Sequence, residues 1–306
     1  MQFDWSMLGG KAPAALVKAR TIAHHAAQWP TRAARANLTA VPDDSHSSLT
    51  WDNSRSTLFS QPLPTDGADV RVGVRVAGPA LIIMRGAVVL DTYELAGRRE
   101  SMVGVWLDSA LRALGLKPAG SVTLPYTIPF HPVARGSAYS FSGEFEAFEE
   151  LARWFAAAED MLEDARAGYA GLVPGPGAIR LWPHHFDIAT LVGLEPVNGE
   201  TTRSVGIGVS LGDHYYPQPY VYVSPWPHLD AKALPDLPPP GIWQTQGFVG
   251  AVATAEQILS LEDRRAGVFA LVRRVCEIGG ASRAPDASDV QEPDAPNGDD
   301  LQGEPQ

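Results

Sequence analysis

His184, His185 and Asp187 lie within four residues of one another, inside the apolar stretch 181–190. If this stretch is an extended strand, alternate side chains share a face, so His185 and Asp187 point one way and His184 points the other. A histidine and a carboxylate on one face offer a metal two ligands, or they form a general base with the acid that orients it. A buried polar network that only satisfies its own hydrogen bonds has the same composition.

His214, in the turn Gly212-Asp213-His214, is the candidate for a third metal ligand. With His185 and Asp187 it would give two histidines and one carboxylate, leaving positions open for water or substrate. Such a set suits iron in oxygen chemistry or zinc in hydrolysis, so the metal hypothesis predicts a divalent cation, zinc or iron. Asp44 and His46 are candidates for further ligands or for residues that orient a ligating imidazole.

The same residues allow chemistry without a metal. Asp44 or Asp187 would orient His46 or His185, and that histidine would act as a general base near neutral pH. The wall of a small-molecule pocket is predicted from aromatic residues: Tyr215, Tyr216, Tyr220, Trp226 and Trp243. The leading hypothesis is an enzyme acting on a small organic molecule. A non-catalytic small-molecule-binding protein and a structural or interaction protein are the alternatives.

Several functional classes are disfavoured by the sequence. The segment 208–212 fits the G-x-S-x-G pattern, but Pro217 follows too soon for the helix that a nucleophile elbow requires. Cys276 is the only cysteine, which excludes a disulfide framework and a cysteine-based zinc site. Of the net charge of −11, the segment 281–306 carries −6, and the rest shows no broad basic face for nucleic acid. Basic residues between Lys11 and Arg35 indicate a solvated helix face, with contact to an anionic ligand or a membrane surface as the alternative.

No apolar run approaches the ~20 residues needed to span a bilayer, and the N-terminus lacks the layout of a secretory signal. We therefore expect a cytoplasmic protein that does not contact membranes. Helical spacing predicts helices over 14–35, with a break at Pro30, and over 100–114, 144–167 and 260–279. Strands are predicted in runs between these helices, which favours an α+β fold with antiparallel sheet packed by three or four helices. The order of elements suggests a weak two-half pseudo-duplication. A single domain over 10–280 and a disordered acidic tail over 281–306 complete the prediction.

The chain contains a set of distinctive short motifs: Asp43-Asp44-Ser45-His46, Trp182-Pro183-His184-His185-Phe186-Asp187-Ile188-Ala189-Thr190, Gly212-Asp213 with Tyr215-Tyr216, and Pro225-Trp226-Pro227. With them the chain resembles a family of uncharacterised bacterial proteins, one of the domain-of-unknown-function families, from about His24 to the last helix. The resemblance implies no activity. Family members often carry histidine where this chain has Gln244 and an acid where it has Gln218, so a ligand at either position would be missing here.

Overall fold

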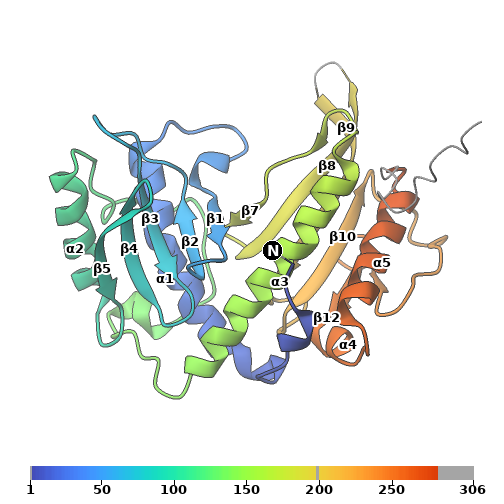
Figure 1. Ribbon diagram of the computed structural model, residues 1–306, viewed down its shortest axis with the longest axis horizontal. Helices are drawn as coiled ribbons and strands as arrows, with labels where there is room; N and C mark the ends of the chain where they lie inside the picture. Colours follow the sequence, from blue (N-terminus) through green and yellow to red (C-terminus); the bar gives the residue numbers. More distant parts are fainter. Residues whose placement is uncertain (1, 198–199, 282–306) are drawn as a thin grey trace, which may run out of the picture.

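The chain folds as an α+β protein around one antiparallel sheet, as the sequence predicts. The computed structural model describes residues 2–197 and 200–281 (Figure 1). Neighbouring strands follow the order β11-β12-β10-β9-β8-β7-β1-β2-β3-β4-β5, and β6 pairs with β8 beside this path. The strands are β1 (Leu49–Asp52), β2 (Thr57–Ser60), β3 (Val70–Arg75), β4 (Ala80–Arg85), β5 (Val88–Glu94), β6 (Gly175–Pro176), β7 (Arg180–Trp182), β8 (Asp187–Val197), β9 (Glu200–Ser210), β10 (Tyr220–Trp226), β11 (Ile242–Gln244) and β12 (Gly250–Thr254).

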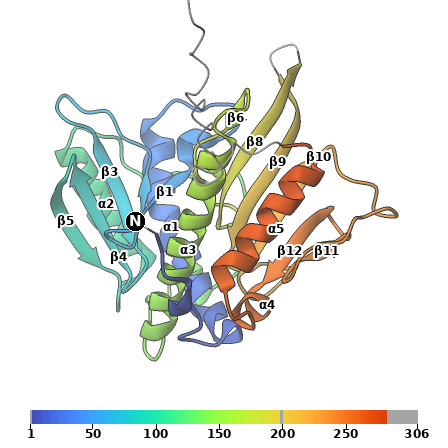
Figure 2. The same cartoon turned by 45° about the vertical axis from the view of Figure 1, so that its right-hand side comes forward.

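Helices separate the chain into two halves. The α-helices of the described residues are α1 (Val17–Asn37), α2 (Glu100–Ala113), α3 (Phe145–Tyr169), α4 (Ala255–Leu259) and α5 (Arg264–Ile278). In the first half, the strands β1 to β5 follow α1; in the second half, the strands β6 to β12 follow α3. The halves meet where β1 pairs with β7, through Leu49 and Leu181. Helices α1 and α3 contact each other between the two parts of the sheet (Figure 2), and one buried cluster includes side chains from both halves.

Helix α1 runs through Pro30 without ending, contrary to the predicted break. Proline lacks the amide hydrogen and its ring crowds the carbonyl one turn earlier, which costs ~3 kcal/mol in a helix interior. Here Trp29, Pro30 and Thr31 are all buried. The packing of these buried residues stabilises the turn and offsets the lost hydrogen bond. Hydrophobic periodicity in the sequence does not reveal this stabilisation.

Packed structure begins before residue 10, because Trp5 and Leu8 are buried and belong to the common core cluster. At the other end, Ala281 is buried and its amide donates to the carbonyl of Cys276 at 2.8 Å. The rest of the predicted tail, 282–306, lies outside the described residues. In the part of the chain that the structure describes, no helix is both long enough and apolar enough to cross a bilayer.

Candidate functional site

The two neighbouring histidines lie in a turn, which corrects the expectation of an extended segment. Residues 183–186 join β7 to β8, and the amides of His185 and Phe186 both donate to the carbonyl of Trp182, at 3.2 and 2.7 Å. Phe186 adopts a left-handed φ of 59°. Since the chain reverses here, the alternation of side chains is interrupted, and the rings of His184 and His185 lie 4.2 Å apart instead of on opposite faces.

Core contacts anchor this turn. The buried Phe186 ring stacks on His24 of α1 at 4.9 Å and meets Phe155 of α3 edge-on at 5.7 Å. The Pro183 carbonyl lies 2.8 Å from Nε2 of His24 and accepts from the Gln28 side chain at 3.0 Å. A carbonyl only accepts, so His24 donates through Nε2. Burial lowers the pKa of His24 to about 4, which keeps this imidazole neutral at pH 7. The turn therefore fixes the start of β8.

Asp187, the first residue of β8, begins a polar row across the sheet. It pairs with Ser210 on β9, and Ser210 pairs with Tyr220 on β10. Residues directly opposite in antiparallel strands share a face, so these three side chains point the same way. The next residues along the strands, Ile188 and Val221, belong to the hydrophobic core. The polar row therefore lies on the sheet face turned away from the core.

A cavity of about 360 Å³ opens over this row. Two carboxylates, Asp187 and Asp213, and two histidines, His185 and His214, contribute to its lining. The remaining lining residues carry aromatic rings or hydroxyl groups: Tyr215, Tyr220, Tyr222, Phe248, Ser210 and Ser224. Neither lysine nor arginine is among the lining residues in the described ranges. The cavity thus combines negative charge with aromatic walls.

Asp187 is buried, and only one of its carboxylate oxygens has a protein partner. The Tyr222 hydroxyl donates to Oδ2 at 2.5 Å, whereas Oδ1 is buried without a hydrogen bond among the described residues. Burial raises the pKa of Asp187 above its ordinary value, although the Tyr222 hydrogen bond and the nearby His185 act in the opposite direction. An unpartnered buried carboxylate oxygen beside a cavity is a group that a ligand can satisfy.

Gly208 makes room for the tyrosine that binds Asp187. It pairs with Tyr222 across β9 and β10, and a Cβ atom at Gly208 would lie 2.4 Å from the Tyr222 hydroxyl oxygen. The ring therefore crosses the strand directly above the glycine backbone. This agrees with the close backbone approach expected of glycine inside a strand.

The second carboxylate, Asp213, organises the loop after β9. Its Oδ1 accepts from the amides of Tyr215 and Tyr216 at 2.7 and 3.2 Å, and its Oδ2 accepts from the Tyr220 hydroxyl at 2.6 Å. Burial, together with this hydrogen bond to Asp213, raises the pKa of Tyr220, which stays protonated. Asp213 thus holds two aromatic lining residues in place.

Arg20 of α1 fastens the same loop from the other half of the chain. Its Nη1 donates to the carbonyls of Leu211 and Pro217, at 3.4 and 3.1 Å. Gly212 between them has φ of 115°, and a Cβ there would lie 2.0 Å from the guanidinium nitrogen. Only glycine fits this conformation and this approach. The guanidinium is directed at backbone oxygens and is not part of the cavity lining.

Two of the five aromatic residues predicted to form the pocket wall line the cavity. Tyr215 and Tyr220 line the cavity, whereas the Tyr216 hydroxyl donates to Gln244 at 2.8 Å, behind the lining. Trp226 is exposed at the far end of β10, and Trp243 donates through its indole N–H to the Pro235 carbonyl at 2.7 Å. The structure therefore places neither tryptophan in the cavity.

Sequence reasoning did not include Tyr222 and Phe248 among the site residues. The signal for Tyr222 is its spacing of two from Tyr220, which puts both rings on one face of a strand. Phe248 comes from the loop between β11 and β12 and meets Tyr215 edge-on at 5.4 Å. Nothing in the local sequence around Phe248 indicates this contact.

Asp44 and His46 lie elsewhere, against α1. Asp44 pairs with Arg35 at 3.0 Å, and the buried His46 accepts from the Val41 amide through Nδ1 at 3.4 Å. The Asp44 carboxylate lies 3.9 Å from this Nδ1. Neither residue lines the cavity that contains Asp187. Asp44 and His46 therefore do not form a common site with Asp187.

The predicted metal ligands His185, Asp187 and His214 line one cavity, but their geometry does not support a shared metal site. Over residues 2–197 and 200–281, no group of three or more histidine, cysteine, aspartate or glutamate side chains is arranged to hold a metal ion. His214 is exposed and its ring lies 3.9 Å from that of Tyr215.

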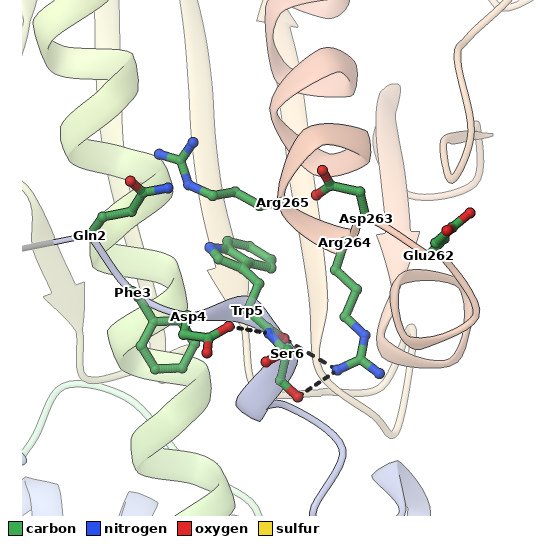
Figure 3. A pocket seen from close by; sticks show the side chains of 9 residues that line it. All are labelled: Gln2, Phe3, Asp4, Trp5, Ser6, Glu262, Asp263, Arg264 and Arg265. Atoms are coloured by element: carbon green, nitrogen blue, oxygen red, sulfur yellow. Dashed lines mark hydrogen bonds between the residues drawn. The ribbon is translucent and has the colours of Figure 1, made fainter.

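A larger cavity, of about 630 Å³, lies where the N-terminal segment meets the start of α5 (Figure 3). Arg264 donates to the carbonyls of Trp5 and Ser6, both at 3.2 Å, and Arg265 donates to Asp160 at 2.9 Å. Arg264 thus attaches the N-terminal segment to α5, and Arg265 attaches α5 to α3. We interpret this cavity as a structural junction.

Replacing Tyr222 with phenylalanine should raise the pKa of Asp187 further. The hydroxyl stabilises the ionised carboxylate, because hydrogen bonds to charged groups contribute ~1.5–3 kcal/mol, so its removal favours the protonated form. Carboxyl ¹³C NMR titration of Asp187 measures this change. Tyr220→Phe is the control, because that hydroxyl donates to Asp213. An unchanged pKa in Tyr222→Phe would contradict the assigned hydrogen bond.

Comparisons with known proteins returned no matches: no family model, curated protein or solved structure matches this chain. The resemblance to a domain-of-unknown-function family stays a prediction. The geometry of the cavity is therefore the basis for assigning a function.

Proposed function

We propose that this protein binds a small organic cation, a compound with a primary or quaternary ammonium group, in the cavity above Asp187. The observation that carries the proposal is the buried Asp187 carboxylate, whose Oδ1 has no hydrogen-bond partner among the described residues and which lines a cavity without lysine or arginine in its described lining. A buried carboxylate is costly unless it is protonated or paired with a positive charge. A cationic ligand would supply that charge.

The aromatic lining supports the same ligand class. Ammonium groups are attracted to the faces of tyrosine and phenylalanine rings, and quaternary ammonium compounds are recognised by clusters of such rings. Tyr215, Tyr222 and Phe248 come from three different segments to line the cavity. Asp213 adds a second negative charge at its edge.

The pH dependence of binding tests this proposal. A bound cation favours ionised Asp187, so the pKa of this residue is lower in the complex than in the free protein, where burial raises it above 3.8. Affinity should therefore be full above the raised pKa and should fall as the pH drops through it. Tetramethylammonium is the probe, because its charge does not change with pH.

Isothermal titration calorimetry across pH 5–8, at constant ionic strength, measures this dependence. The uncharged control ligand is neopentyl alcohol (2,2-dimethylpropan-1-ol), in which a quaternary carbon replaces the nitrogen and one methyl group carries a hydroxyl; it should show weaker, pH-independent binding. Equal affinity for the two ligands, or no detectable tetramethylammonium binding at any pH, would reject the proposal.

Catalysis by proton transfer at the same site is a second candidate function. It is favoured by the raised pKa of Asp187 and by the presence of His185 in the same cavity, where its charge acts on the carboxylate. Incubating the protein in D2O with a mixture of small amines, and following by mass spectrometry the replacement of their carbon-bound hydrogens by deuterium, tests whether a proton is removed from carbon and returned. Turnover should occur with the native protein and be lost in Asp187→Asn; unchanged amines in both samples would leave binding alone as the function supported.

A further inference from the structure

A third cavity, of about 390 Å³, lies between α1 and the segment 120–128. His25, Gln28 and Arg32 line it from the helix, and their spacing of three and four residues puts them on one helix face. The hydroxyl-bearing residue Tyr126 is among those that line the opposite wall. This cavity has no residue in common with the one above Asp187.

Arg32 is the charged group of this cavity that has no counter-ion. Its Nε is buried without a hydrogen-bond partner, and no ion pair of its guanidinium occurs within residues 2–197 and 200–281. The guanidinium carbon lies 4.9 Å from the Trp29 ring centroid. One turn further along the same helix, Arg35 pairs with Asp44 at 3.0 Å. Among the described residues, Arg35 thus has an ion-pair partner and Arg32 has none.

The other two residues of α1 that line the cavity, Gln28 and His25, form hydrogen bonds. Gln28 donates to two backbone carbonyls and accepts from the Tyr126 hydroxyl at 2.9 Å. His25 contacts the Pro129 carbonyl through Nε2 at 2.9 Å. These contacts fix the walls, so the cavity is a formed site in which the Arg32 guanidinium is still available.

Charge around the cavity is positive. Neither aspartate nor glutamate is among the described residues that line it. The Glu100 carboxyl senses the charge of Arg32: burial raises the pKa of Glu100 and Arg32 lowers it, but the two form no ion pair among the described residues. We propose that this cavity binds a small oxyanion, carboxylate or phosphate, through the planar guanidinium of Arg32. Arginine matches both anions because its N–H groups donate in pairs.

Thermal unfolding with sodium phosphate, sodium acetate and sodium chloride at equal ionic strength tests the proposal. Phosphate or acetate should raise the Tm of the native protein saturably, by at least about 2 °C over chloride. Arg32→Met keeps a long apolar side chain on Trp29 but removes the charge, and should lose this rise. Arg71→Met removes the same charge from an exposed position on β3 and should keep it.

A second measurement uses only the native protein, in case Arg32→Met does not fold. Phenylglyoxal modifies accessible arginines, and mass spectrometry should show that phosphate or acetate slows modification of Arg32 at least threefold but leaves Arg71 unaffected. The proposal would be overturned by the absence of an anion-specific Tm rise in the native protein, by an equal rise in Arg32→Met, or by equal modification of Arg32 with and without the anions. None of these outcomes depends on ammonium binding above Asp187.

Discussion

Asp187→Asn is expected to lower the affinity for tetramethylammonium by at least about 30-fold, or about 2 kcal/mol at pH 8. The change removes the negative charge that would face the bound cation. Asparagine has nearly the same shape, and its carbonyl oxygen still accepts from the Tyr222 hydroxyl. The fold should therefore persist, and calorimetric titration of the two proteins measures the loss.

Ser224→Ala is the matched control, because Ser224 lines the same cavity and its hydroxyl donates to the Val249 carbonyl at 3.2 Å. Its affinity for tetramethylammonium should stay within about threefold of the native value. If Asp187→Asn bound as tightly as the native protein, Asp187 would have no part in recognising the cation. Unfolding of Asp187→Asn would instead support a structural role for this carboxylate.

Gly208→Ala should destabilise the protein by about 1–3 kcal/mol, the usual range for overpacking, and should weaken ligand binding as well. The added methyl group meets the Tyr222 ring, with the nearest ring atom 2.4 Å away. The ring must move, and the hydrogen bond to Asp187 is then lost. Urea unfolding measures the change in the free energy of unfolding, and the titration described above measures binding.

Gly206→Ala provides a control on the same strand and the same face. A Cβ at Gly206 would meet only the Ser224 carbonyl oxygen, at 3.8 Å, which is an ordinary van der Waals contact. This variant should unfold within about 0.5 kcal/mol of the native protein. Equal effects of the two substitutions would show that the ring above Gly208 is not held as described.

The fold class follows from the sequence because its signals are local. Runs of strands between amphipathic helices indicate antiparallel sheet, and α2 begins at the predicted residue, Glu100. Pro30 shows the limit of this reasoning. A helix passes through proline when buried contacts compensate, and those contacts come from residues distant in sequence.

The sequence also predicts part of the candidate site: several of its residues, but not how they are arranged. Asp187, His185, Tyr215 and Tyr220 were singled out, and they do line one cavity. The predicted geometry was wrong in one respect: residues 183–186 form a four-residue turn, where a strand was expected. The convergence with Asp44 and His46 was not found, since pairing across distant segments depends on strand order, which the spacing of residues within a segment does not specify.

The hydrogen bond from Arg20 to Leu211 joins residues that are 191 positions apart in the chain. Every residue that lines the cavity above Asp187 belongs to the second half, yet the loop that carries three of them, Asp213, His214 and Tyr215, is held by Arg20 from a helix of the first half. If recombination transferred the second half alone, all the residues that line the cavity would be transferred with it. Arg20 and its hydrogen bonds to the loop after β9 would be lost. The two halves are therefore expected to be inherited as one unit, even though only one of them lines the cavity.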